Sequence, residues 1–225
     1  MIKFYFHPTP NPMKVALIFE ELGLDFEVVP VDTMKGEQHL PAFTAINPNA
    51  KVPAIDDEGT IVFDSNAILI YIAEKYGKEL LGADANRGEL LSWMMFIGTG
   101  IGPFSGQAVH FQHFAPEKIE YAINRYRREI QRLYGVLDAK LAGKEYIVGD
   151  SYTIADISAW GWLDRVGFVL GENALDDYPN LKTWFACIDA RPAVEKARKV
   201  GSDIQFKKER DEEALRAMFP QNYAK

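Results

Sequence analysis

The chain has 225 residues, 48% of them hydrophobic, which is enough for one or two domains with a substantial core. Its formal net charge is -7 at pH 7, so it lacks the positive excess with which proteins hold nucleic-acid backbones. A single cysteine, Cys187, excludes an intrachain disulfide and a metal site built from several thiolates. His110 and His113 are neighbours without an acid or third histidine at a motif spacing, so no metal is expected.

The N-terminal sequence lacks the basic, apolar and small-residue zones of a signal peptide. No run approaches the roughly 20 apolar residues of a membrane-spanning helix. We therefore expect a cytoplasmic protein that does not bind membranes.

The first 32 residues predict a βαβ unit. Strand-like runs at 2–6 and 26–32 flank a stretch at 13–23 in which Val15 and its apolar neighbours recur at helical spacing until Gly23.

A hairpin and a helix follow. The runs 51–56 and 61–63 predict two strands around the turn Asp-Glu-Gly-Thr, and residues 64–77 predict a helix with Asp64 or Ser65 as its N-cap. The polar run 78–89 is a candidate linker.

From about residue 85 onward the patterns are helical. Apolar residues recur at steps of three and four between Pro116 and Gly143, which predicts one long helix. Thr153 and Asp156 form a capping-box pattern at the start of another helix. One or two helices are expected in 178–199, and a charged helix in 207–219. The predicted domains are residues 1–80 and residues 85–225.

Three motifs carry a family resemblance: Val52-Pro53 after a strand signal, Asp64-Ser65 at a helix start, and Thr-Ile-Ala-Asp-Ile at 153–157. Together with the order of the elements they resemble the cytosolic glutathione transferases over about residues 1–200. The resemblance implies an α/β thioredoxin-like N-terminal domain, an all-α C-terminal domain, a homodimer, and a site in the cleft between the domains.

The resemblance also implies residue roles in binding glutathione. Pro53 would be cis, and the backbone of Val52 would pair with the cysteinyl backbone of glutathione. Ser65, at a helix N-terminus, would bind the γ-glutamyl α-carboxylate, and Asp64 the α-amino group. Plain helix capping is the other interpretation of this pair, and both can hold together.

The rest of the predicted site surrounds the glycyl end and the sulfur of glutathione. Gln38 and Lys51 are candidates for the glycyl end. Thr9 and Asn11 are the candidates to stabilise the thiolate. A hydrogen bond to the charged sulfur is worth roughly 1.5 to 3 kcal/mol, which lowers the pKa of a thiol by about one to two units. No cysteine stands at this turn, so the nucleophilic sulfur must come from glutathione.

Within the family the sequence is most similar to the bacterial nu class, which is related to the fungal nitrogen-regulatory prion protein. That class implies Thr9 and Asn11 near the sulfur, Arg132 as a further glutathione contact, and reduction of small disulfides with two glutathiones per subunit. Modest conjugation to electrophiles is implied as well. Two other functions remain open: a non-catalytic glutathione-binding regulatory module, and a glutathione-dependent dehalogenase or isomerase.

Other residues have competing interpretations. Tyr5 could be the thiolate donor, but an aromatic residue in a strand usually packs. His110 and His113 either line the second-substrate pocket or pack at the surface. Arg132 lies in a polar helical stripe and could be merely solvated or ion-paired. Cys187, in an apolar helical run, is expected in the core.

Overall fold

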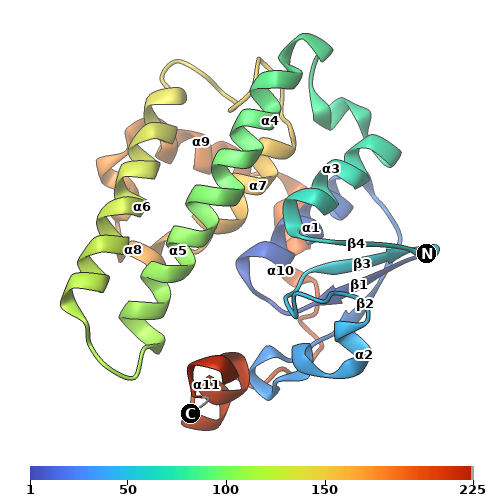
Figure 1. The fold of residues 1–225 in the computed structure, drawn as a ribbon. Helices are drawn as coiled ribbons and strands as arrows, with labels where there is room; N and C mark the ends of the chain where they lie inside the picture. The colour runs from blue at the N-terminus through green and yellow to red at the C-terminus, as the bar shows by residue number, and fades with distance from the viewer. Residues whose placement is uncertain (224–225) are drawn as a thin grey trace. The chain divides into compact units, whose positions relative to one another are not determined.

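The computed structural model describes residues 1–223, and these form two compact units (Figure 1). One unit comprises Met1–Tyr71 together with residues 196–223, called here the C-terminal segment, and the other comprises Ile72–Glu195. The C-terminal segment thus belongs to the first unit, whereas the expected division of 1–80 and 85–225 placed it with the helices.

The first unit contains a four-stranded sheet in the order β2-β1-β3-β4. The strands are β1 (Ile2–Phe6), β2 (Phe26–Pro30), β3 (Ala54–Asp57) and β4 (Thr60–Phe63). β1 is parallel to β2 and antiparallel to β3, which is antiparallel to β4. The helices of this unit are α1 (Pro10–Leu22), α2 (Pro41–Thr44) and α3 (Ser65–Tyr76), the last of which continues into the second unit. The mixed sheet confirms the thioredoxin-like prediction.

Alternating aromatic residues of β1 pack on opposite faces of the sheet. Phe4 and Phe6 are fully buried, and the Phe4 ring lies 5.3 Å from that of Phe19 on α1. Tyr5 points to the other face, where its ring lies 5.7 Å from that of Phe43 on α2. The period of two along a strand therefore places α1 and α2 on opposite faces.

The C-terminal segment is fixed to the first unit by polar and aromatic contacts. The backbone N–H of Lys207 donates to Asp32 Oδ2 at 2.8 Å, and the ring of Phe206 lies 4.7 Å from that of His7. Burial opposes ionisation of Asp32, but hydrogen bonds from the backbone amides of Lys207 and Met34 hold its pKa below the ordinary value. These contacts explain why the segment belongs to this unit. The predicted charged helix within it is α11 (Glu212–Met218).

The second unit is helical. Its α-helices include α4 (Arg87–Phe96), α5 (Gly102–Val109), α6 (Glu120–Lys140), α7 (Ile154–Leu163), α8 (Val166–Leu170) and α9 (Pro179–Asp189). α10 (Pro192–Lys199) spans the boundary between the units. The candidate linker at 78–89 contains 3₁₀ turns at Lys78–Leu81 and Asp84–Asn86, and α4 begins at Arg87. None of the described helices is long and apolar enough to cross a membrane.

The predicted capping box at the start of α7 is present. Thr153 is the N-cap, and Asp156 Oδ2 accepts from the Thr153 backbone N–H at 2.9 Å. Asp156 Oδ1 accepts from the Ile147 backbone N–H at 3.0 Å and from Trp184 Nε1 at 2.8 Å. The carboxylate therefore joins the start of α7 to the preceding loop and to α9.

Candidate functional site

The turn between β1 and α1 carries the two predicted thiolate ligands. Thr9 is the N-cap residue of α1 but does not cap it through its side chain; its hydroxyl lies 3.5 Å from the carbonyl O of His7. Asn11 lies in the first turn of α1, and both side chains are partly exposed. A polar Thr and Asn thus stand where the chain leaves the sheet, with no cysteine beside them.

The segment before β3 carries the predicted backbone contact. The Val52-Pro53 peptide is cis, as the resemblance implies. Pro53 is buried, and Val52 packs against the small cluster of Val31, Phe43 and Ala54. Since β3 begins at Ala54, the backbone of Val52 lies outside the strand ladder.

The start of α3 carries the predicted γ-glutamyl contacts. Asp64 has a positive φ of 72°, and its Oδ1 accepts from the backbone N–H groups of Asn66 at 2.9 Å and Ala67 at 3.1 Å. The capping interpretation of Asp64 is therefore confirmed. Ser65 begins the helix and is 6% exposed.

The sheet brings these three segments to one edge. Tyr5 pairs with Ala54, and Ala54 pairs with Phe63. These antiparallel registers bring the end of β1, the start of β3 and the end of β4 to the same end of the three strands. The turn with Thr9, the backbone of Val52 and the N-terminus of α3 therefore meet at the same end of neighbouring strands.

Gln38 and Lys51, the candidates for the glycyl end, have different surroundings. Lys51 is exposed, and its carbonyl O accepts from Asn47 Nδ2 at 2.6 Å. Gln38 is 4% exposed, and its Nε2 donates to the carbonyl O of Ala217 on α11 at 3.2 Å. Its buried Oε1 has no hydrogen-bond partner among the described residues. The C-terminal segment thus orients a predicted ligand-binding side chain.

One charged residue near this edge was missed by the sequence reasoning. Lys14 on α1 is 1% exposed, and its Nζ lies 3.5 Å from Ser65 Oγ. Burial lowers the pKa of Lys14 to about 7, although the charge of Asp64 acts in the opposite direction. One signal in the sequence could have identified it. Lys14 is a lone lysine within an otherwise apolar run of α1, whereas a solvent-exposed helix face usually carries several polar residues.

Arg132, the remaining predicted ligand, lies in the second unit, on an exposed part of α6. It donates to Glu129 through Nε at 3.1 Å and through a terminal nitrogen at 2.7 Å. Arg125 also lies within ion-pair distance of Glu129, at 3.7 Å. The ion-paired interpretation describes Arg132 in the structure, and its role as a glutathione contact stays a prediction.

The histidines of this unit lie in a π-helical turn, His110–Phe114. His113 stacks on Phe168 with ring centroids 4.3 Å apart, and its Nε2 lies 3.1 Å from the Phe168 carbonyl O. The His110 ring packs against Phe111, and burial lowers the pKa of His110. Both rings thus pack against neighbouring aromatic side chains, and their place in a second-substrate pocket stays a prediction.

The prediction that Cys187 lies in the core was wrong, because it is exposed on α9. Its Sγ lies 3.8 Å from Glu145 Oε1, and partial burial together with this carboxylate raises the thiol pKa. A thiol held protonated is a poor nucleophile. Among the described residues there is also no cluster of side chains that could hold a metal ion.

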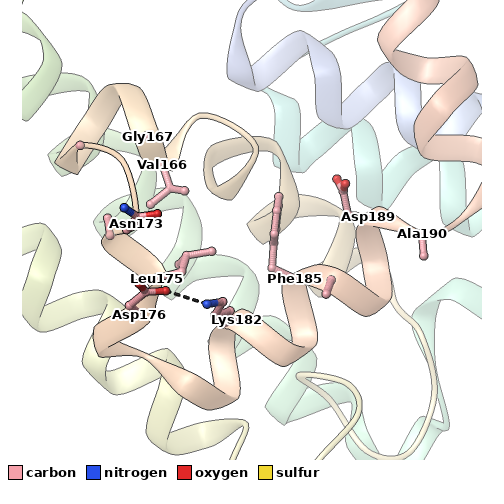
Figure 2. A pocket seen from close by; sticks show the side chains of 12 residues that line it. Val166, Gly167, Asn173, Leu175, Asp176, Lys182, Phe185, Asp189 and Ala190 are labelled. Atoms are coloured by element: carbon pink, nitrogen blue, oxygen red, sulfur yellow. Dashed lines mark hydrogen bonds and ion pairs between the residues drawn. The ribbon is translucent and has the colours of Figure 1, made fainter.

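A separate pocket of about 500 Å³ lies within the second unit (Figure 2). Val166, Leu175 and Phe185 contribute apolar surface, and Lys182 donates to Asp176 at 2.6 Å. None of the predicted site residues lines it, so it is distinct from the edge of the sheet described above.

A thioredoxin-like unit joined to a helical unit, with a Val-cis-Pro segment and an acid-Ser pair at one edge of the sheet, defines the glutathione transferase class of folds. The sequence model described as glutathione S-transferase, N-terminal domain, matches residues 1–74, and the corresponding C-terminal domain model matches residues 93–192. The chain belongs to the glutathione S-transferase family.

Similar proteins include two from Escherichia coli strain K12. The disulfide-bond oxidoreductase YfcG is 42% identical over 204 residues, which cover 88% of this chain and 94% of that protein. The disulfide-bond oxidoreductase YghU is 38% identical over 213 residues, covering 88% and 74%. A crystal structure of a glutathione transferase homolog from Lodderomyces elongisporus, with two glutathiones per subunit, has a TM-score of 0.84 and 35% identity, covering 88% of this chain and 98% of that one.

Proposed function

We propose that the protein is a glutathione-dependent disulfide-bond oxidoreductase of nu-class type with modest conjugating activity. Glutathione binds at the shared edge of β1, β3 and β4. The backbone of Val52 pairs with its cysteinyl group, Ser65 and the α3 N-terminus bind the γ-glutamyl carboxylate, and Thr9 and Asn11 donate to the sulfur.

The proposed reaction uses the sulfur of glutathione as the nucleophile. The thiolate of a first glutathione attacks one sulfur of a small disulfide, which forms a mixed disulfide and releases one thiolate. A second glutathione attacks the glutathione sulfur of the mixed disulfide, which gives oxidised glutathione and the second thiolate. The two glutathiones are oxidised by two electrons in total, the substrate is reduced by two, and each released thiolate takes up a proton.

One observation carries the proposal: the edge of the sheet combines the predicted glutathione contacts with a turn that offers Thr9 and Asn11 but no protein thiol. Disulfide exchange needs only moderate activation, because the best attacking thiol has a pKa near ambient pH. One or two hydrogen bonds at a helix start are sufficient for this. The names of YfcG and YghU and the two glutathiones per subunit of the Lodderomyces elongisporus structure support the same chemistry.

The test is steady-state reduction of a small disulfide by glutathione, coupled to glutathione reductase, beside conjugation of an aryl halide. Removing a hydrogen bond to a thiolate costs roughly 1.5 to 3 kcal/mol. We therefore expect Thr9→Ala or Asn11→Ala to lower kcat by roughly tenfold to a hundredfold while glutathione still binds. Thr60→Ala, an exposed residue of β4, is the matched control and should keep wild-type turnover.

Tight binding of glutathione without turnover in either assay would favour the non-catalytic module. Turnover only of halogenated or unsaturated substrates would favour the dehalogenase or isomerase. Arg132 as a glutathione contact and the homodimer stay predictions. Glutathione titration of Arg132→Met tests the first, and sedimentation of the purified protein tests the second.

A further inference from the structure

Lys14 is a buried cation with little compensation from the protein. Its ammonium can donate three hydrogen bonds, yet Ser65 Oγ, at 3.5 Å, is the only acceptor within hydrogen-bonding distance among the described residues. A charge removed from water is stable only when it is paired and hydrogen-bonded. The ammonium therefore has unused capacity for an anion.

The charged groups around Lys14 are few. Of the charged side chains in the described part of the chain, Asp64 at the start of α3 is the one whose field raises the pKa of Lys14. Asp64 is itself exposed, and its Oδ1 caps α3. Desolvation consequently outweighs this attraction and lowers the pKa of Lys14 to about 7.

The position of Lys14 identifies the anion that would pair with its ammonium. Its hydrogen-bond partner within residues 1–223 is the hydroxyl of Ser65, which begins α3 and at which the ligand's carboxylate is expected. A hydroxyl that accepts from an ammonium still has its own proton to donate. That proton is then available to a carboxylate at the helix N-terminus, where negative charge is favoured.

We propose that Lys14 is a positioning residue of the glutathione site: it orients the Ser65 hydroxyl and supplies the positive charge that selects the α-carboxylate of the γ-glutamyl group. This inference rests on the glutathione site proposed above. Binding of the carboxylate stabilises the ammonium form, so glutathione binding takes up a proton near neutral pH.

The first experiment measures Kd between pH 6 and pH 8 by isothermal titration calorimetry with S-methylglutathione, whose sulfur carries no titratable proton. With a free-state pKa of about 7 for Lys14, linkage predicts that the wild type binds roughly tenfold more weakly at pH 8 than at pH 6. Lys14→Met, of similar length and without charge, should bind weakly with a flat profile. Lys3→Met, the same change at an exposed position of β1, should keep the wild-type profile.

Specificity is tested with the analogue lacking the α-carboxylate, 4-aminobutyryl-S-methylcysteinyl-glycine. The wild type and Lys14→Met should bind it with equal affinity and without a pH slope in this range. A Lys14→Met variant that keeps the tenfold slope, or loses as much affinity for the analogue as for S-methylglutathione, overturns the inference.

A second measurement needs no variant. At pH 7 the wild type should take up about half a proton per bound S-methylglutathione, obtained from titrations in buffers of different ionisation enthalpy. Absence of proton uptake overturns the role of Lys14 even if Lys14→Met does not fold. A wild type that does not bind S-methylglutathione at any pH overturns the glutathione site itself, so the two failures are distinguishable.

Discussion

Replacing Asp156 with alanine should destabilise the helical unit strongly. The substitution leaves the backbone N–H groups of Thr153 and Ile147 and the indole N–H of Trp184 without their acceptor. All three residues are at most 2% exposed, so water cannot replace the carboxylate without rearrangement. A buried donor left unsatisfied costs about 1 to 3 kcal/mol, so the three together cost roughly 4 to 6 kcal/mol when their incomplete additivity is allowed for. That is a large part of the total stability of a typical domain.

The assay is urea unfolding followed by circular dichroism. Asp156→Asn keeps one oxygen acceptor and should lose about half as much free energy of unfolding, while Thr153→Ala removes only the side-chain cap and should lose about 1 kcal/mol. Asp150→Ala, an exposed acidic residue nearby, is the matched control and should stay within about 0.5 kcal/mol of the wild type. A loss below about 1 kcal/mol for Asp156→Ala would refute the assignment of Asp156 as the acceptor that joins α7 to its neighbours.

Three further changes test the first unit. Asp32→Asn should release the C-terminal segment, at a cost of about 1 to 3 kcal/mol, because the Lys207 N–H loses its carboxylate; faster amide exchange at Lys207 measures it. Since the folded pKa of Asp32 is lowered, its contribution is present above pH 4 or so and lost as pH falls further. Between about pH 7 and pH 10.5 the unfolded chain binds a proton at Lys14 that the native protein lacks. The free energy of unfolding of the wild type, relative to that of Lys14→Met, should therefore rise with pH by at most about 1.4 kcal/mol per pH unit. Gly201→Ala should cost about 1 to 3 kcal/mol in urea unfolding, because φ is +71° and its Cβ would lie 2.8 Å from Phe6 Cε1. Unchanged amide exchange at Lys207 in Asp32→Asn, no pH slope between wild type and Lys14→Met, or unchanged stability of Gly201→Ala would each contradict the corresponding contact.

The amino-acid sequence was sufficient for features that depend on neighbouring residues. The alternation in β1, the Gly23 stop of α1 and the Thr153–Asp156 capping box all arise from interactions within a few residues, and the structure contains each of them. The order of these elements, together with the short motifs, also identified the family. By contrast, the apolar character of the run around Cys187 could not show which side of α9 that residue occupies.

Only the tertiary structure decided the features that join distant parts of the chain. Segments remote in sequence meet at one edge of the sheet because the strand registers align them, and the C-terminal segment belongs to the first unit because Lys207 and Phe206 find Asp32 and His7 there. In the sequence, Lys14 is a single charged residue within a predicted helix. The fold buries its ammonium next to the first residue of α3, and desolvation, which no local pattern encodes, gives this lysine an unusual pKa.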